Sequence, residues 1–391
     1  MIVRLSITAL SPLAFPERKP GDQFRPSQPF VPGGVIYGAL GERCYAPERF
    51  AALRCHNAYP AKQGDTWVRP LPSSALRPKG QDGAPVYDAL VERVCWQRQE
   101  PRALVYSPTD SQGRAWDRAD LPFYTLHHQP DLLHSRNVTR RMLTRVAISR
   151  QSGTAADQQL YSPLVLSEVN SNARDEPAIF VGSAVLPDGD DEALEALKGI
   201  THLGGRQTSG LGRVKIEVSY SDPDGAAAIK QRILHLSERF QRQAQLYQQL
   251  GGTEWSILGT DEDAHRLIFT VNLLSDTILT EHGWLPSYTL SEQFLEELTG
   301  IRAELLAASI DPIVCAGWNV LWQRPKHTAP GLRKGGVFVF QAEHRLTSEH
   351  YERLAHLQID GIGERRQEGY GQIRICDEFH MEQRYELARD R

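Results

Sequence analysis

Two short stretches decide the expected fold: residues 203–216 read LGGRQTSGLGRVKI, and residues 362–375 read IGERRQEGYGQIRI. One offset of 159 residues aligns three glycines and the first arginine of both stretches: Gly204 with Gly363, Arg206 with Arg365, Gly210 with Gly369 and Gly212 with Gly371. The same offset carries a strand-like segment, 178–185, onto 337–344 and a helix-like segment, 191–199, onto 350–358. Loops with matching flanks at one offset indicate an internal duplication.

Each half opens on an alternating, strand-like pattern, at residues 2–10 and 267–274. Strands, helices and hairpin-like pairs in this order are typical of the β-α-β-β-α-β unit. We therefore expect an α+β fold of two tandem ferredoxin-like (RRM-like) domains with long loop insertions, each closed by its Gly-rich loop. The first half exceeds the bare unit, so residues 12–32 and much of 45–130, rich in Pro, Gly and Arg, should be loops and insertions.

A chain of 391 residues suits two domains. The expected boundaries are residues 1–221 for the first domain, 222–262 for a connecting helix and linker, and 263–391 for the second domain. Apolar residues at helical spacing between 226 and 250 predict a long helix that docks one half on the other. They are Ile229, Ile233, Leu236, Phe240, Ala244 and Tyr247.

Composition limits the functional classes. The formal net charge of -4 and pI near 6.4 exclude a uniformly basic nucleic-acid coat, but a local basic patch can still bind phosphates. Apolar runs such as 267–274 are far shorter than the roughly 20 residues that span a bilayer. The N-terminus alternates like a strand and lacks the pattern of a signal peptide, so we expect a cytoplasmic protein without membrane contact.

Cysteine usage favours reduced thiols. The five cysteines are dispersed and contain no C-x-x-C pair. Cys44, Cys55, His56 and Cys95 could supply four zinc ligands, but structural zinc sites use closely spaced pairs. We therefore expect no metal and no other cofactor. The five residues are Cys44, Cys55, Cys95, Cys315 and Cys376.

The Gly-rich loops are the main candidates for RNA binding. Glycine lets the backbone take positive φ and approach a ligand, and arginine is a planar, permanently charged partner for phosphate. The alternative is a tight turn between helix and strand, whose glycines only satisfy sterics. The loops follow a helix and precede a strand, the reverse of a dinucleotide-binding site. The candidate residues are Gly204, Gly205, Arg206, Gly210, Gly212, Arg213, Gly363, Arg365, Arg366, Gly369 and Gly371.

A second candidate surface is residues 132–156, which carry five arginines and no acidic side chain. A hairpin that presents arginine would suit an RNA backbone, whereas the competing interpretation is an edge strand kept soluble by charge. The predicted contacts are Arg140, Arg141, Arg145 and Arg150. A third candidate is the start of the helix in 30–41, where Gly33 and Gly34 offer free amides to an anion. Gly38 and Ala39 should let that helix pack closely on the sheet.

Catalytic patterns are sparse. His127, His128 and His134 could act as general acid and base in RNA cleavage through the 2′-hydroxyl. Clusters of this kind are unsurprising among 13 histidines, so an endoribonuclease is the rival hypothesis and not the leading one. An interaction scaffold that contacts only protein is a further alternative.

The chain resembles the RAMP superfamily of CRISPR-associated proteins. The resemblance rests on PGGVIYGALGE, HNAYP, RPLPSSALRPKG, TRVAISRQSGTAADQQLYS, LGGRQTSGLGRV, CAGWNVLWQRPKH, KGGVFVF and GIGERRQEGYGQI. More narrowly, it is similar to the type III (subtype III-D) effector subunit that caps the 5′ end of the guide RNA. The resemblance implies ferredoxin-like domains, a guide-RNA (crRNA) 5′ handle as ligand, and no catalytic role. The implied partners are the large signalling subunit and the backbone RAMP subunits, without a small-molecule substrate. Many relatives carry a Cys/His metal cluster, of which only Cys95 is present here.

Overall fold

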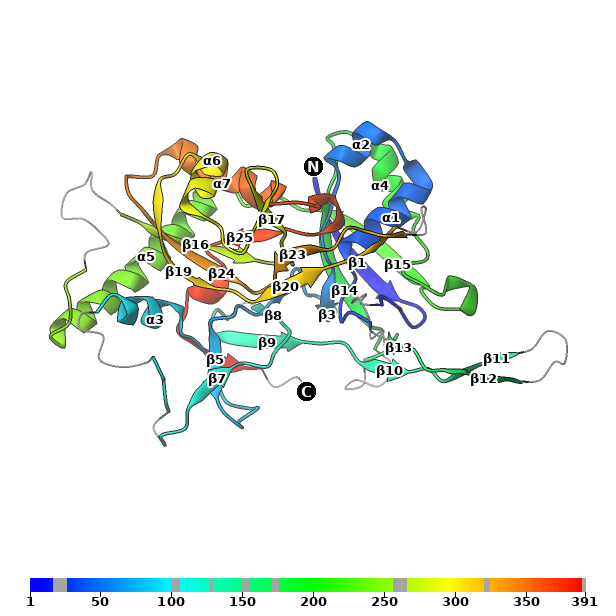
Figure 1. Ribbon diagram of the computed structural model, residues 1–391, viewed down its shortest axis with the longest axis horizontal. Helices are drawn as coiled ribbons and strands as arrows, with labels where there is room; N and C mark the ends of the chain where they lie inside the picture. Colours follow the sequence, from blue (N-terminus) through cyan, green and yellow to red (C-terminus); the bar gives the residue numbers. More distant parts are fainter. Residues whose placement is uncertain are drawn as a thin grey trace.

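The computed structural model describes residues 1–16, 27–99, 106–110, 112–126, 129–148, 155–170, 176–255, 266–319 and 324–388. It is a mixed α/β molecule with two antiparallel sheets, one in each half (Figure 1). In strand β1 (Ile2–Ala9), the alternation in the sequence decides which face of the sheet is buried: Val3, Leu5 and Ile7 are buried and alternate with half-buried polar residues.

The first sheet has the order β15-β1-β14, with β2 and β3 both paired to β14. Helices α1 and α4 cover it, and their residues Ile36, Leu40 and Leu197 pack on those of β1. The elements of this half are β1 (Ile2–Ala9), α1 (Gly33–Cys44), α2 (Pro47–Ala52), β2 (Arg54–Cys55), β3 (Tyr59–Ala61), β14 (Ile179–Val185), α4 (Asp191–Lys198) and β15 (Val214–Tyr220).

The second sheet has the order β19-β24-β16-β25. In both halves, the sheet strands taken in chain order are therefore arranged as fourth, first, third and second. The elements of this half are β16 (Ile268–Leu273), β17 (Leu279–Glu281), β18 (Leu285–Ser287), α6 (Glu292–Thr299), β19 (Ala303–Ser309), β20 (Pro312–Cys315), β21 (Trp318–Asn319), β22 (Arg324–Pro325), β23 (Ala329–Leu332), β24 (Val337–Ala342), α7 (Ser348–Asp360) and β25 (Ile373–Ile375).

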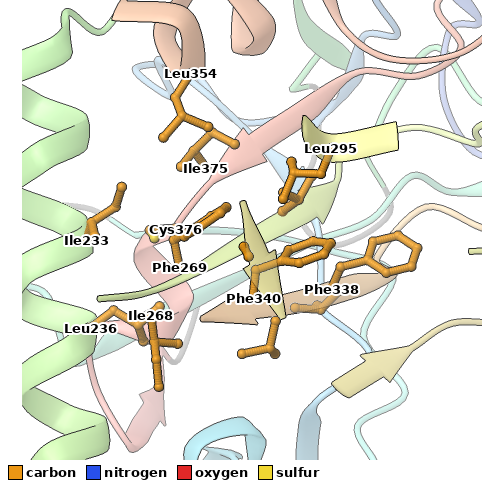
Figure 2. Close-up of a cluster of buried hydrophobic side chains, with 14 of the residues drawn as sticks. Ile233, Leu236, Ile268, Phe269, Leu295, Phe338, Phe340, Leu354, Ile375 and Cys376 are labelled. Atoms are coloured by element: carbon orange, nitrogen blue, oxygen red, sulfur yellow. The ribbon is translucent and has the colours of Figure 1, made fainter. Parts of the chain in front are cut away.

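The long helix α5 (Ala226–Gln249) belongs to the core of the second half. Figure 2 shows Ile233 and Leu236 of α5 together with Leu295 of α6 and Leu354 of α7 in one apolar cluster with sheet residues. The predicted stripe is confirmed, since five of its residues are buried and Tyr247 packs at the margin. Its neighbours are β16, α7 and α3 (Leu90–Gln97), so within the described chain the helix completes the second core.

The insertion of the first half is more ordered than expected. Instead of loops alone, it forms most of a seven-stranded sheet of order β4-β8-β9-β26-β6-β5-β7. Strand β26 comes from the C-terminal end of the chain and lies between two strands of the insertion. These strands are β4 (Arg69–Pro70), β5 (Ala75–Pro78), β6 (Val86–Asp88), β7 (Trp116–Arg118), β8 (Phe123–Leu126), β9 (Leu132–Arg136) and β26 (Arg384–Leu387).

A hairpin extends far from the body of the first half (Figure 1). Its base pairs β10 with β13, and its outer part pairs β11 with β12. The hairpin predicted from the arginine-rich segment is therefore present. Its strands are β10 (Arg140–Met142), β11 (Arg145–Ile148), β12 (Ala155–Tyr161) and β13 (Leu164–Leu166).

Candidate nucleic-acid interface

The two Gly-rich loops have the same backbone conformation. Arg206 and Arg365 both adopt left-handed geometry, with φ of 62° and 53°. A 3₁₀ turn follows each of them and ends at a left-handed glycine, Gly210 or Gly369. Left-handed backbone costs a non-glycine residue about 1–2 kcal/mol. The duplication inferred from the offset thus extends to individual backbone torsions.

The first loop, residues 204–213, is fastened to the segment that follows β1. The Gly205 amide donates to the Ala14 carbonyl at 3.0 Å, and the Gly212 amide donates to the Pro12 carbonyl at 2.9 Å. Its outer part, residues 205–210, is exposed. A Cβ atom added at Gly210 would meet no atom within 4 Å among the described residues. Hydrogen bonds to Pro12 and Ala14 therefore fix one side of this loop, and the side formed by residues 205–210 is exposed.

The charge of the first loop is positive. Arg206 and Arg213 are both exposed, and residues 203–216 contain no acidic side chain. Lys215 is also exposed, and its ammonium bonds the Glu217 carboxylate at 2.7 Å. An open loop with two arginines beside flexible glycines has the chemistry of a phosphate contact.

The second loop, residues 363–371, packs on the first half of the same chain. A Cβ added at Gly33 would lie 2.9 Å from the Cα of Gly369 and 1.9 Å from the Cys55 carbonyl oxygen. A Cβ added at Gly34 would make only an ordinary contact, 3.5 Å from the Cβ of Glu368. The Gly33 amide, predicted as an anion contact, donates to the Asn57 Oδ1 at 2.8 Å. The start of α1 and the second loop are thus brought together as an internal contact between the two halves.

The charged residues of the second loop bond to the chain itself. Arg365 donates through Nη2 to the His327 carbonyl at 2.5 Å, and its Nη1 is buried without a hydrogen-bond partner among the described residues. Arg366 donates to the Asp360 carbonyl at 3.4 Å. Glu368 pairs with Lys326 at 2.6 Å. This loop is less open and less positive than its counterpart in the first half.

The arginines of the hairpin segment have different environments. Arg140 is exposed, whereas Arg141 bonds both carboxylate oxygens of Glu168 at 2.6 and 2.7 Å. Arg136 is buried on β9, where its Nε donates to Asp65 at 2.6 Å. Arg145 lies on β11, of which the structure describes the backbone, and Arg150 lies outside the described residues.

One expectation for α1 is wrong. Gly38 does not let the helix approach the sheet, because it is exposed and a Cβ there would meet no atom of the described residues within 4 Å. Ala39 is half-buried at the margin of the core. The close approach occurs instead five residues earlier at Gly33, the first residue of α1, where the helix meets Cys55 and the second loop.

Sequence reasoning missed a cleft of about 400 Å³ between the two halves. Arg4 and His56 line it from the first half, and Gln358 and Arg374 line it from the second. Its wall continues into a buried ionic cluster in which Arg69 bonds Asp377 at 3.0 Å and also contacts Glu378. No sequence signal identifies this pairing, because about 300 residues separate its members.

The ionic cluster holds its carboxylates charged. Burial raises the pKa of Glu378, but Arg69 and Arg374 outweigh burial and hold that pKa well below its usual range. Burial raises the pKa of Asp224 in the same way, and Arg374 and Arg232 lower it below its usual range. The cluster therefore holds the two halves together by charge-assisted contacts, with acidic and basic groups nearly balanced.

The histidines considered for catalysis are not assembled into a described site. His127 and His128 lie outside the described residues. His134 lies on β9, half-buried and in register with Thr125 of β8. Across the described parts of the chain, no three His, Cys, Asp or Glu side chains are grouped so that they could hold a metal ion. In those same parts, no helix combines the length and apolar character needed to cross a membrane.

The chain was compared with curated proteins and with solved structures. Among curated proteins, none matches it in sequence. Similar solved structures include a chain of the Type III-B Cmr-beta complex bound to cognate target RNA and AMPPnP, with 12% identity over 86% of each chain and a TM-score of 0.41. Another is a chain of the Csm3-Csm4 subcomplex in the type III-A CRISPR-Cas interference complex. Its sequence identity is 12%, the match covers 88% of this chain and 95% of that chain, and the TM-score is 0.35.

One family of proteins matches this chain in sequence over more than half of its length. The model of the CRISPR-associated protein family Cas_Cmr3 matches residues 141–378, which is more than half of the 391 residues. The matched region runs from the hairpin strand β10 through the first loop to the second loop. The chain therefore belongs to the Cas_Cmr3 family of CRISPR-associated proteins, and the assignment to a type III CRISPR-associated RAMP protein, made from its loops and motifs, is confirmed.

Proposed function

We propose that this chain is a non-catalytic guide-RNA subunit of a type III effector complex, of subtype III-D, and that its first Gly-rich loop contacts the 5′ handle. One comparison within the chain carries the proposal. Two loops of one duplicated design have matching torsions, yet Gly369 is packed against Gly33, while a Cβ at Gly210 would meet no described atom within 4 Å. The loop that stays open is also the one with two exposed arginines and no acid.

Each half is proposed to be a ferredoxin-like unit, with boundaries at 1–221, 222–262 and 263–391. The shared strand order and the paired helices of each half support this reading. Sheets of this kind commonly serve RNA recognition, with loops that follow the phosphate backbone. RNA binding by the second loop and by the start of α1 stays a prediction, and the packing of these two segments on each other favours the first loop as the RNA contact. The residues concerned are Gly363, Arg365, Arg366, Gly369, Gly371, Gly33 and Gly34.

The proposed partners are the guide RNA, the large signalling subunit and the backbone RAMP subunits, in the cytoplasm and without a small-molecule substrate. Membership of the Cas_Cmr3 family supports a role inside a CRISPR complex. The hairpin of the first half is proposed as a further RNA contact through Arg140 and its neighbours. The exposed position of Arg140 and the projection of the hairpin from the body support this (Figure 1).

The test is RNA binding by the full chain as a function of salt. Arg206→Gly suits the left-handed backbone and removes one charge, and Arg213→Ala removes a second. Each lost phosphate contact should lower the slope of log affinity against log salt by about 0.7 for single-stranded RNA. Arg353→Ala on α7 is the matched control, because that arginine is exposed and pairs with Glu349 at 2.5 Å. Slopes equal to the control in both loop variants would sink the proposal.

A further inference from the structure

The second half carries a hairpin that repeats the design of the first. Between the second and third strands of its sheet, β20 pairs with β23, and beyond them β21 pairs with β22. In the first half, the pairs β10 with β13 and β11 with β12 occupy the same place in the strand order. Each half therefore has a two-part hairpin, here called the first hairpin (residues 140–166) and the second hairpin (residues 312–332).

The two hairpins are anchored in the same way. Leu166 at the base of the first hairpin bridges Leu13, which follows β1, and Leu332 at the base of the second bridges Thr277, which follows β16. Such equivalent bridges are not expected of unrelated insertions. They indicate that the hairpin was part of the unit that was duplicated.

Each hairpin base also packs on the Gly-rich loop of its own half. Leu211 of the first loop packs with Ala14, Val165 and Leu143. Tyr370, which lies 159 residues later at the offset of the duplication, packs in a cluster with Ile278, Cys315 and Ala329. A hairpin and a Gly-rich loop thus form one compact unit in both halves.

The chemistry of the second hairpin matches that of the first. The second hairpin, residues 312–332, contains Arg324 and Lys326 and no acidic side chain, and the first hairpin, residues 140–166, contains four arginines and one acid, Asp157. Arg324 is exposed near the outer end and is in register with Asn319. The half-buried Trp318 lies opposite the neighbouring Pro325, one position along the strand pair. An exposed arginine with a half-buried aromatic ring nearby combines the two kinds of group that contact single-stranded RNA, a cation for phosphate and a ring for base stacking.

Contacts to the second loop fix where this hairpin lies. Lys326 pairs with Glu368 at 2.6 Å, and Arg365 donates to the His327 carbonyl at 2.5 Å. The charges of the second loop therefore position the hairpin, and Arg324 remains toward solvent. Figure 1 shows the first hairpin extending far from the body, whereas β20 and β23 of the second hairpin lie in the middle of the molecule.

We infer that the second hairpin is a second arm for single-stranded RNA, contacting the guide RNA through Arg324 and the Trp318 ring. The inference rests on the proposed function, because it takes the guide RNA as the ligand. It adds a contact in the second half that is separate from the first loop. The internal loop of that half acts as a support for the hairpin and not as the RNA contact.

The experiment uses the full chain and a labelled guide RNA, with affinity measured across salt concentrations. Arg324→Ala should lower the salt slope by about 0.7, and the reduction should add to that of Arg213→Ala because the two sites are separate. Arg353→Ala should leave the slope unchanged. Ultraviolet crosslinking of the unaltered chain should also attach RNA to the peptide that contains Trp318, which gives a readout independent of any variant's folding.

The outcomes separate this inference from the proposed function. A slope lowered by Arg213→Ala but not by Arg324→Ala, with no crosslink in residues 312–332, would overturn the second arm and leave the proposed function standing. Slopes unchanged in both variants would overturn both. If Arg324→Ala left RNA binding intact and instead released a protein subunit from the assembled complex, the hairpin would be a protein contact and the inference would be wrong.

Discussion

Arg206 and Arg365 are the residues in which the duplication is most visible. Both hold left-handed backbone, a conformation that favours glycine, at equivalent points of the two loops. The environments of their side chains differ, because Arg365 is half-buried beside the second hairpin, to whose His327 carbonyl it donates, and Arg206 lies on the exposed part of the first loop. Retaining arginine at a strained position is understandable where its guanidinium makes a contact that glycine cannot supply.

His56 gives a residue-scale prediction about pH. Burial, with a smaller contribution from Arg54, lowers its pKa from 6.5 to about 4. The unfolded chain therefore binds one more proton than the folded chain between these values, so stability falls as pH drops through this window. The loss should approach about 3 kcal/mol at pH 4.

His56→Gln removes this titration and keeps a polar group near the Ser183 hydroxyl, which lies 2.8 Å from the His56 Nδ1. Urea unfolding at pH 7 and pH 4.5 should show a smaller acid loss in the variant than in the unaltered chain. Carboxylates such as Glu378 titrate in both proteins and cancel in the comparison. An identical acid loss in the two proteins would contradict the prediction.

At the scale of elements, the contact between α1 and the second loop joins the two halves. It depends on two glycines whose backbones touch, Gly33 and Gly369, and on Asn57, which accepts from the Gly33 amide. The sequence indicated both glycine-rich segments as candidate anion contacts, and Glu364 and Glu368 already made the second loop the less electropositive of the two Gly-rich loops. Their mutual packing depends on how the halves are oriented, for which the local pattern holds no information.

The prediction at this scale compares two glycines of one helix. Gly33→Ala should destabilise the chain by about 1–3 kcal/mol, because its Cβ would overlap the Cys55 carbonyl and crowd Gly369. Gly38→Ala should instead stabilise it by about 0.5–1 kcal/mol, because that position is helical and open. Denaturant unfolding measures both changes. Shifts of equal sign and size would show that the close approach is unimportant.

At the scale of the whole molecule, strand β26 ties the end of the chain into the insertion of the first half. Tyr385 is fully buried and stacks on Phe379 with ring centroids 4.8 Å apart. Its hydroxyl donates to the Phe379 carbonyl at 2.7 Å. This strand makes the insertion depend on residues that follow it by more than 200 positions.

Tyr385→Ala should therefore cost about 3–5 kcal/mol, and the loss should be concentrated in the seven-stranded sheet. Tyr385→Phe keeps the ring and should cost only about 1 kcal/mol for the lost hydrogen bond. Hydrogen exchange should show reduced protection in β6 and β9 of the alanine variant, with β1 and β14 largely unchanged. A uniform loss of protection across both halves would argue against a local role for β26.

The sequence by itself determined the repeat of the two glycine-rich stretches, strand β1, helix α5 and the positive φ of the repeated loop glycines. Alternation in β1, the apolar stripe of α5 and the glycine spacing are local constraints, so they can be read without knowing distant partners. Only the tertiary structure decided which loop is open, where β26 pairs, and that a second hairpin repeats the first. These depend on contacts between residues far apart in the chain, and such contacts leave no periodic pattern in either partner.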